Sequence, residues 1–124
     1  MPATNAGRDF VAAAIIGEVT TDFTNANSYI GVGDGTTAFA VSQTDLQGTN
    51  KLRKGMNSTY PSRSANVLTF QATFLESEAN FAWQEWAVFN ASSGGAMLNR
   101  LVQSLGTKPN TEQWRLTATL TLGV

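Results

Sequence analysis

The first segment of the chain places its apolar residues at helical spacing. They recur at i, i+1, i+4 and i+5 and so share one stripe of a helix: Phe10, Val11, Ala14 and Ile15. Thr4 or Asn5 can cap the start of this helix, and Gly17 is a typical residue for its end. The pattern predicts a helix over residues 4–17. Because about three turns of helix are marginally stable alone, we expect it to dock on another surface.

From residue 20 onward, apolar and polar positions alternate, as they do in half-buried strands. Strands are expected at six places: residues 29–32, 52–60, 67–75, 81–90, 97–103 and 113–122. A single helical turn is predicted at residues 44–47. Five or six strands after one helix, joined by turns rich in Gly, Ser, Asn and Pro, predict a mainly β fold, an antiparallel β-sandwich or small barrel. Residues 1–17 would form an N-terminal helical arm and residues 18–124 a single β-sandwich domain.

The aromatic-rich segment 81–90 is apolar on both faces. Strict alternation assigns one face to Phe81, Trp83, Glu85, Ala87 and Phe89, and the other to Ala82, Gln84, Trp86 and Val88. Two apolar faces are typical of a central strand or of a strand at an interface. Glu85 lies among apolar neighbours, where an unpaired carboxylate is costly. We expect it to bond to a loop backbone or to Arg53, Lys54 or Arg100, with a contact to another subunit as the alternative.

Composition narrows the possible functions. The 124 residues are 42% hydrophobic and 14% charged, with a formal net charge of −1 and neither Cys nor His. Nucleophile–His mechanisms and thiolate metal sites are therefore excluded, and near-neutral charge disfavours nucleic-acid binding. No apolar run approaches the roughly 20 residues that span a bilayer. We expect no enzymatic activity, no cofactor and no metal, and neither nucleic acid nor membrane as a partner.

Two weaker chemical signals have simpler explanations. Residues 31–35 read Gly-Val-Gly-Asp-Gly, but neither the Gly-Lys-Ser/Thr of a phosphate loop nor a helix follows them. We interpret them as a strand end and a turn that uses glycines at positive φ. The carboxylates Glu76 and Glu78 could in principle act as a hydrolytic pair. Their spacing is more typical of a solvated turn between two strands.

The basic cluster consists of Lys51, Arg53, Lys54 and Arg63. Alternation places Lys51 and Arg53 on one face of a strand and Lys54 on the other. A solvated edge that blocks strand addition is the first interpretation, and docking on an acidic protein surface is the alternative.

The three tryptophans, Trp83, Trp86 and Trp114, could stack on sugars. Packing in the core or at an interface is the favoured interpretation, since tryptophans are enriched in both.

Two ordered blocks of the sequence carry a resemblance to tailed-phage proteins. Residues 29–38, followed by Thr44-Asp45-Leu46 and the basic segment 51–54, resemble the opening of small tailed-phage virion proteins. Residues 83–91 and 94–100 are similar to the Glu-x-Gly-aliphatic-Phe-Asp/Asn stretch of phage tail-collar fibre domains, with Ala87 where that family usually has Gly. The likeness runs from about residue 29 to the C-terminus.

This resemblance implies a non-enzymatic structural component of a bacteriophage particle. The chain carries no fibre shaft, which favours a capsid decoration or cement protein that binds the outer coat shell and bridges coat subunits. The alternatives are a small tail, collar or fibre-attachment subunit of baseplate or adaptor type and, less favoured, a carbohydrate-binding module on the virion surface. The expected partners are the major capsid protein and neighbouring copies of the chain, as a trimer or dimer. The expected location is the virion, on the capsid surface, after assembly in the host cytoplasm.

Candidate subunit contacts come from the helix stripe, the basic cluster and the block 83–100. They are Phe10, Val11, Ile15, Lys51, Arg53, Lys54, Trp83, Glu85, Trp86 and Arg100.

Overall fold

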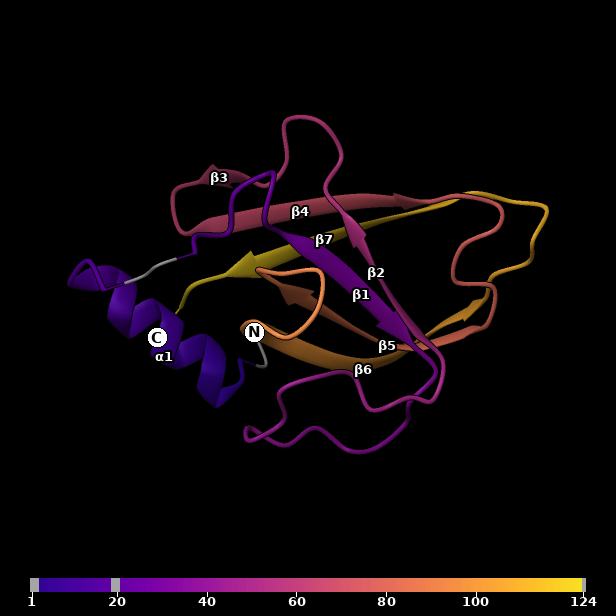
Figure 1. Ribbon diagram of the computed structural model, residues 1–124, viewed down its shortest axis with the longest axis horizontal. Helices are drawn as coiled ribbons and strands as arrows, with labels where there is room; N and C mark the ends of the chain where they lie inside the picture. The colour runs from indigo at the N-terminus through magenta and orange to yellow at the C-terminus, as the bar shows by residue number, and fades with distance from the viewer. Residues whose placement is uncertain (1–2, 19–20, 124) are drawn as a thin grey trace.

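The protein folds into two antiparallel β-sheets packed face to face, with one short helix at an end (Figure 1). The computed structural model describes residues 3–18 and 21–123. The elements are, in chain order, α1 (Asn5–Ile15), β1 (Tyr29–Gly33), β2 (Lys51–Gly55), β3 (Ser62–Ser64), β4 (Val67–Phe74), β5 (Ala82–Phe89), β6 (Met97–Thr107) and β7 (Trp114–Thr121). The predicted mainly β sandwich with one short helix is confirmed.

One sheet has four strands in the order β2-β1-β5-β6, and the other has three in the order β3-β4-β7. The described residues thus contain seven strands, one more than the six positions predicted. β3 is the addition, and its three exposed residues are too few to show an alternation. The prediction of a strand over 52–60 is also too long, since β2 ends at Gly55. Beyond β2 the chain turns, and the backbone N–H of Asn57 donates to the carbonyl of Gln71 on β4.

The main core lies between the two sheets. The predicted alternation in β4 is confirmed, because Phe70, Ala72 and Phe74 are fully buried there. The ring of Trp83 meets the rings of Phe74 and Trp114 edge to face, with centroids 4.9 and 5.1 Å away. Edge-to-face contacts at these separations are the preferred arrangement of aromatic pairs. All three tryptophans belong to this core or pack against it, as expected for packing residues.

The faces of β5 differ from the prediction at one point. Trp83 shares the inter-sheet core with Trp86 and Val88, whereas Glu85 and Phe89 lie on the opposite face. The pairing of β5 with β6 shifts register between Trp83 and Glu85. Across this shift β5 advances two residues, from Trp83 to Glu85, while β6 advances four, from Gly106 to Val102. Strict alternation does not hold through such an irregularity, so a period of two assigned Trp83 to the wrong face. The prediction that β5 is a central strand is confirmed, since it lies between β1 and β6.

The long loop 34–50 covers the outer face of the four-stranded sheet. Its Leu46 is buried in a second, smaller core with Ala87, Phe89 and Met97. The predicted helical turn at 44–47 is wrong, because this segment has a bend at Asp45 and no regular secondary structure. Two of its backbone N–H groups, on Gln47 and Gly48, donate to the carboxylate of Glu85 instead of closing a turn of helix.

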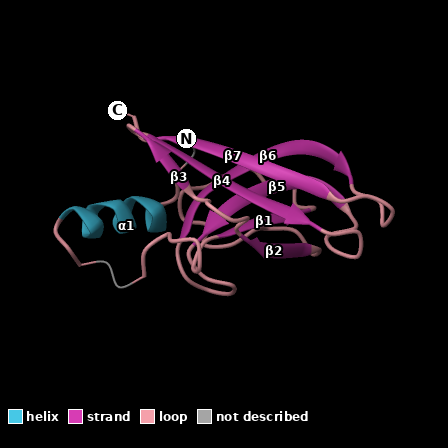
Figure 2. Cartoon of the chain, turned by 90° about the horizontal axis from the view of Figure 1, so that it is seen from above, coloured by secondary structure: helices cyan, strands magenta, loops and turns pink. Residues whose placement is uncertain are grey.

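The helix α1 is attached to the sandwich by its first turn. Thr4 is the cap: its hydroxyl accepts from the N–H of Gly7 and donates to the carbonyl of Met97 on β6. Gly7 is buried so close to β6 that a Cβ would lie 2.2 Å from the carbonyl oxygen of Leu98. Figure 2 shows the helix lying beyond one end of the strands, not over a sheet face. Among the described residues of α1, Gly7 alone is buried.

Candidate functional site

Glu85 and Arg100 form an ion pair with no exposed side-chain surface. Arg100 Nε lies 2.7 Å from Glu85 Oε1, and the remaining donors of the guanidinium bond to Gln43 Oε1 and the carbonyl of Thr37, both at 3.0 Å. Glu85 also accepts backbone N–H bonds from Gly35, Gln47 and Gly48. The expected loop-backbone and Arg100 partners of Glu85 are both confirmed. The pair joins β5 and β6 to loop 34–50.

Two glycines of segment 31–35, Gly33 and Gly35, lie against this same site. An added Cβ at Gly33 or at Gly35 would lie 2.5 Å from Glu85 Oε2. None of the positive-φ glycines of the described chain falls in this segment, so the prediction of turn glycines at positive φ is wrong. These positions require glycine because the carboxylate and the loop approach the backbone too closely for a side chain. Gly33 and Gly35 thus leave room for the Glu85 carboxylate, and the segment does not form a phosphate loop.

Three members of the basic cluster form ion pairs within the chain. Lys51 and Arg53 both bond to Asp45, at 2.9 and 3.3 Å, while Lys54 on the other face bonds to Glu78 at 2.8 Å. The guanidinium of Arg53 also lies 3.4 Å from the centroid of the Phe89 ring. The predicted division of these residues between two faces is confirmed. Lys51, Arg53 and Lys54 lie on the edge strand β2 and bond to carboxylates of the chain, whereas Arg63 lies on β3 and donates to the carbonyl of Ala65.

Hydrogen bonds within the chain hold Glu78 and Asp34 in their ionised form. The hydrogen bond from Lys54, supported by the backbone N–H of Leu75, holds the pKa of Glu78 below its usual range. Hydrogen bonds from the side chain and backbone of Asn50 likewise lower the pKa of Asp34. Glu76 bonds to Gln113, so Glu76 and Glu78 contact different partners and do not face one another as a catalytic pair would.

Several candidate contact residues lie inside the protein. Trp83, Glu85 and Arg100 have almost no exposed surface, and Trp86 is 8% exposed. A side chain that the chain's own fold encloses cannot touch another subunit, so these four are corrected to interior positions. For Glu85 the sequence itself indicated an interior position, because a carboxylate among apolar neighbours requires a partner within the fold. Of the tryptophans, only the half-buried Trp114 is left with a surface on which a sugar could stack.

At the helix end of the molecule, by contrast, large apolar side chains are exposed. Ile15 and Ile16 retain 78% and 68% of their surface, the largest exposed fractions among the large hydrophobic residues of the described chain. Phe10 packs its ring edge to face on Phe23, with centroids 4.8 Å apart, so the start of the predicted apolar stripe is docked. Its end is not. The helix thus leaves an apolar surface that its own sandwich does not cover.

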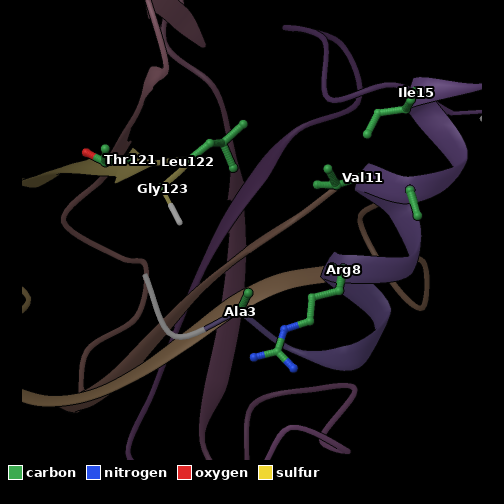
Figure 3. A pocket seen from close by; sticks show the side chains of 9 residues that line it. Ala3, Arg8, Val11, Ile15, Thr121, Leu122 and Gly123 are labelled. Atoms are coloured by element: carbon green, nitrogen blue, oxygen red, sulfur yellow. The ribbon is translucent and has the colours of Figure 1, made fainter.

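A cleft runs between this uncovered part of α1 and the end of β7. It has a volume of about 550 Å³ and is lined on the helix side by Arg8, Val11 and Ile15 and on the other side by Leu122. Figure 3 shows Val11 and Ile15 projecting from α1 toward the cleft, with Leu122 facing them. A second, more apolar hollow of about 330 Å³ adjoins it, lined by Phe10, Val11, Ala14, Ile15, Phe23, Leu68, Leu98 and Leu122. Residues 122 and 68 were not singled out by sequence because the cleft depends on tertiary packing.

Arg8 stands at the rim of this cleft without a carboxylate. The ion pairs found among residues 3–18 and 21–123 involve Lys51, Arg53, Lys54 and Arg100, and none involves Arg8. Within the described residues, the cleft therefore combines an apolar floor with a positive charge that no carboxylate pairs. A peptide segment or protein surface with an apolar side chain beside a carboxylate would match both features.

The described part of the chain offers little else for chemistry. It contains no cluster of three or more Asp and Glu side chains that could hold a metal ion. The described helix is too short and too weakly apolar to cross a membrane. No protein-family model and no curated protein matches the chain. Of the places considered, the cleft beside α1 therefore remains the candidate functional site.

Proposed function

We propose that this chain is a bacteriophage virion structural protein, and specifically a capsid decoration protein that binds the outer coat shell through the cleft beside α1. The observation that carries the proposal is the helix itself. An eleven-residue helix that buries only Gly7, and that ends on the exposed Ile15 followed by the exposed Ile16, gains little from its own sandwich. Such short helices owe most of their stability to tertiary packing. A partner surface that covers the apolar end would complete that packing.

The rigid part of the molecule suits a structural role. The Glu85–Arg100 ion pair joins β5 to β6 in the interior. Backbone N–H groups of loop 34–50, on Gly35, Gln47 and Gly48, donate to Glu85 and hold the loop on the sheet. Binding therefore requires little rearrangement of the sandwich and costs little conformational entropy. The order of motifs along residues 29–38 and 83–100, which resembles tailed-phage virion proteins, points to a phage particle as the setting.

The coat partner is expected to present an apolar side chain flanked by a carboxylate. The apolar group would enter the cleft against Val11, Ile15 and Leu122, and the carboxylate would pair with Arg8. A single cleft of this size buries less than a standard interface, which takes about 800 Å² from each partner. Many copies on one shell add their contributions, because every bound copy favours the assembled coat.

The direct experiment uses shells from the phage that encodes the chain, prepared without this protein. Purified protein added to such shells should bind in a fixed ratio to the coat protein and should raise the temperature at which shells rupture. Shells that neither bind the protein nor gain stability would refute the proposal. A small tail, collar or adaptor subunit is the second candidate, and mass spectrometry of whole particles separates the two. A decoration protein is present in hundreds of copies, whereas a tail subunit is present in tens or fewer.

A further inference from the structure

The two sheets have four outer edges, and three of them are protected from pairing with another strand. β2 is five residues long and carries Lys51, Arg53 and Lys54, while β3 has only three residues. On β6, Ala3 forms a bridge to Asn99, and the pairing of β6 with β5 shifts register twice. Short strands, charged side chains, irregular pairing and covering segments are the usual means of blocking edge-to-edge association.

The fourth edge, β7, has one charged residue and none of the other features. Its eight residues pair with β4 without a register shift, from Trp114 opposite Phe74 to Thr121 opposite Val67. Among the described strands, β4 is its only neighbour. The sequence of β7 contains no proline and a single charge, Arg115. A regular edge of this kind is a template for an added strand.

We propose that β7 pairs antiparallel with β7 of a second copy of this chain, so that the two three-stranded sheets join into one. A two-fold axis at Ala118 places Thr117 opposite Thr119 of the second copy, and Arg115 opposite Thr121. All of these side chains lie on the exposed face, as the pleat requires of residues directly opposite one another.

Charge favours a second copy as the occupant. In this register the two Arg115 side chains lie about 20 Å apart, six residues at about 3.3 Å each, so no like charges face each other. Threonine pairs across strands are favourable. On the inner face, Leu116 lies opposite Leu120 of the second copy, and pairing covers Leu116, which the isolated chain leaves half-exposed. The eight residues of β7 are fewer than the about 20–30 residues per partner in a standard interface. The dimer is therefore weak in dilute solution and forms where copies are crowded.

Sedimentation of the purified protein tests this, over a concentration series that reaches about 1 mM, the effective concentration typical of closely attached domains. The wild-type protein should dimerise within this range. Thr117→Lys combined with Thr119→Lys places like charges opposite each other and should weaken the dimer about tenfold or more. Ser62→Lys with Ser64→Lys is the matched control, since it adds the same charge to the other edge of the same sheet and should leave the dimer unchanged. Unfolding midpoints equal to that of the wild type show that both variants are folded.

The absence of cysteine allows a second test of the register. An equimolar mixture of Thr117→Cys and Thr119→Cys proteins should form interchain disulfides faster than either protein alone, and faster than a Ser62→Cys and Ser64→Cys mixture. A wild-type protein that stays monomeric throughout would overturn the proposal, as would equal crosslinking at β3 and β7. If β7 instead accepts a strand from a different protein, the isolated chain stays monomeric. These measurements use no coat shells, so their failure is separate from a failure of the proposed function.

Discussion

Arg100 Nε donates to Glu85 Oε1 at 2.7 Å, and neither side chain has any exposed surface. The two residues face each other across β5 and β6, and together they hold Thr37, Gln43, Gln47 and the glycines of loop 34–50. This pair, which replaces the role in subunit contact first considered for both residues, fixes the outer layer of the four-stranded sheet. Its removal should therefore loosen the loop as well as lower the stability.

Glu85→Gln should destabilise the protein by about 3–5 kcal/mol, because Arg100 is left as an uncompensated buried charge. Urea unfolding monitored by tryptophan fluorescence measures the change. Glu78→Gln is the matched control, since it breaks the half-exposed pair with Lys54, whose side chains are 26% and 29% exposed. A surface pair of that kind contributes about 0–1 kcal/mol. Equal losses in the two variants would contradict the structural role assigned to Glu85.

Gly35→Ala should also destabilise the fold, because its Cβ would lie 2.5 Å from Glu85 Oε2 and from the backbone N of Gly48. Overpacking of this kind costs about 1–3 kcal/mol. Gly55→Ala is the control within a neighbouring strand, where the nearest atom to a Cβ is a ring carbon of Tyr29 at 3.8 Å. That variant should unfold at the temperature of the wild type or slightly above it. Thermal melts of both proteins decide whether close approach is the reason for glycine at position 35.

Thr4→Ala should detach the start of α1. The substitution removes the cap on Gly7 and the bond to the carbonyl of Met97, and loss of a threonine cap costs about 1–2 kcal/mol. Helical circular dichroism should fall while the sheet signal is kept. Thr4→Ser, which preserves the hydroxyl, should retain the helix. An unchanged helix in Thr4→Ala would show that the cap does not hold α1 on the sandwich.

Stability should decline in acid partly through Glu78. Its pKa in the folded protein is lower than the ordinary value of 4.5 in the unfolded chain, because Lys54 and the N–H of Leu75 bond to the ionised form. The contribution is therefore complete above pH 4.5 and is lost as the pH falls through the lowered value. Wild type and Glu78→Gln should differ by at most about 1 kcal/mol at neutral pH and converge in acid. A difference that widens as the pH falls would contradict this sign.

Alternation was sufficient to predict most of the strands and the central place of β5, because burial on one face imposes a period of two. It could not reveal the register shift after Trp83, because that irregularity depends on how β5 pairs with β6 and not on the local sequence of β5 alone. Glu85 was expected to need an internal partner, and its neighbours in sequence gave that information. The cleft beside α1 was not predictable, because Leu122 and Val11 meet only once the sandwich is formed.

Shell binding by two matched variants tests the proposed function most directly. Ile15→Ser removes the exposed apolar side chain at the cleft, and Leu75→Ser removes one that is 43% exposed at the turn after β4. Both should fold with wild-type stability, because neither side chain is buried. The measurement is the amount of each protein that sediments with coat shells lacking the wild-type chain. We expect Ile15→Ser to bind at least about tenfold more weakly, the loss of about 1.4 kcal/mol, and Leu75→Ser to bind like the wild type. Equal binding of Ile15→Ser and wild type would contradict the assignment of the cleft.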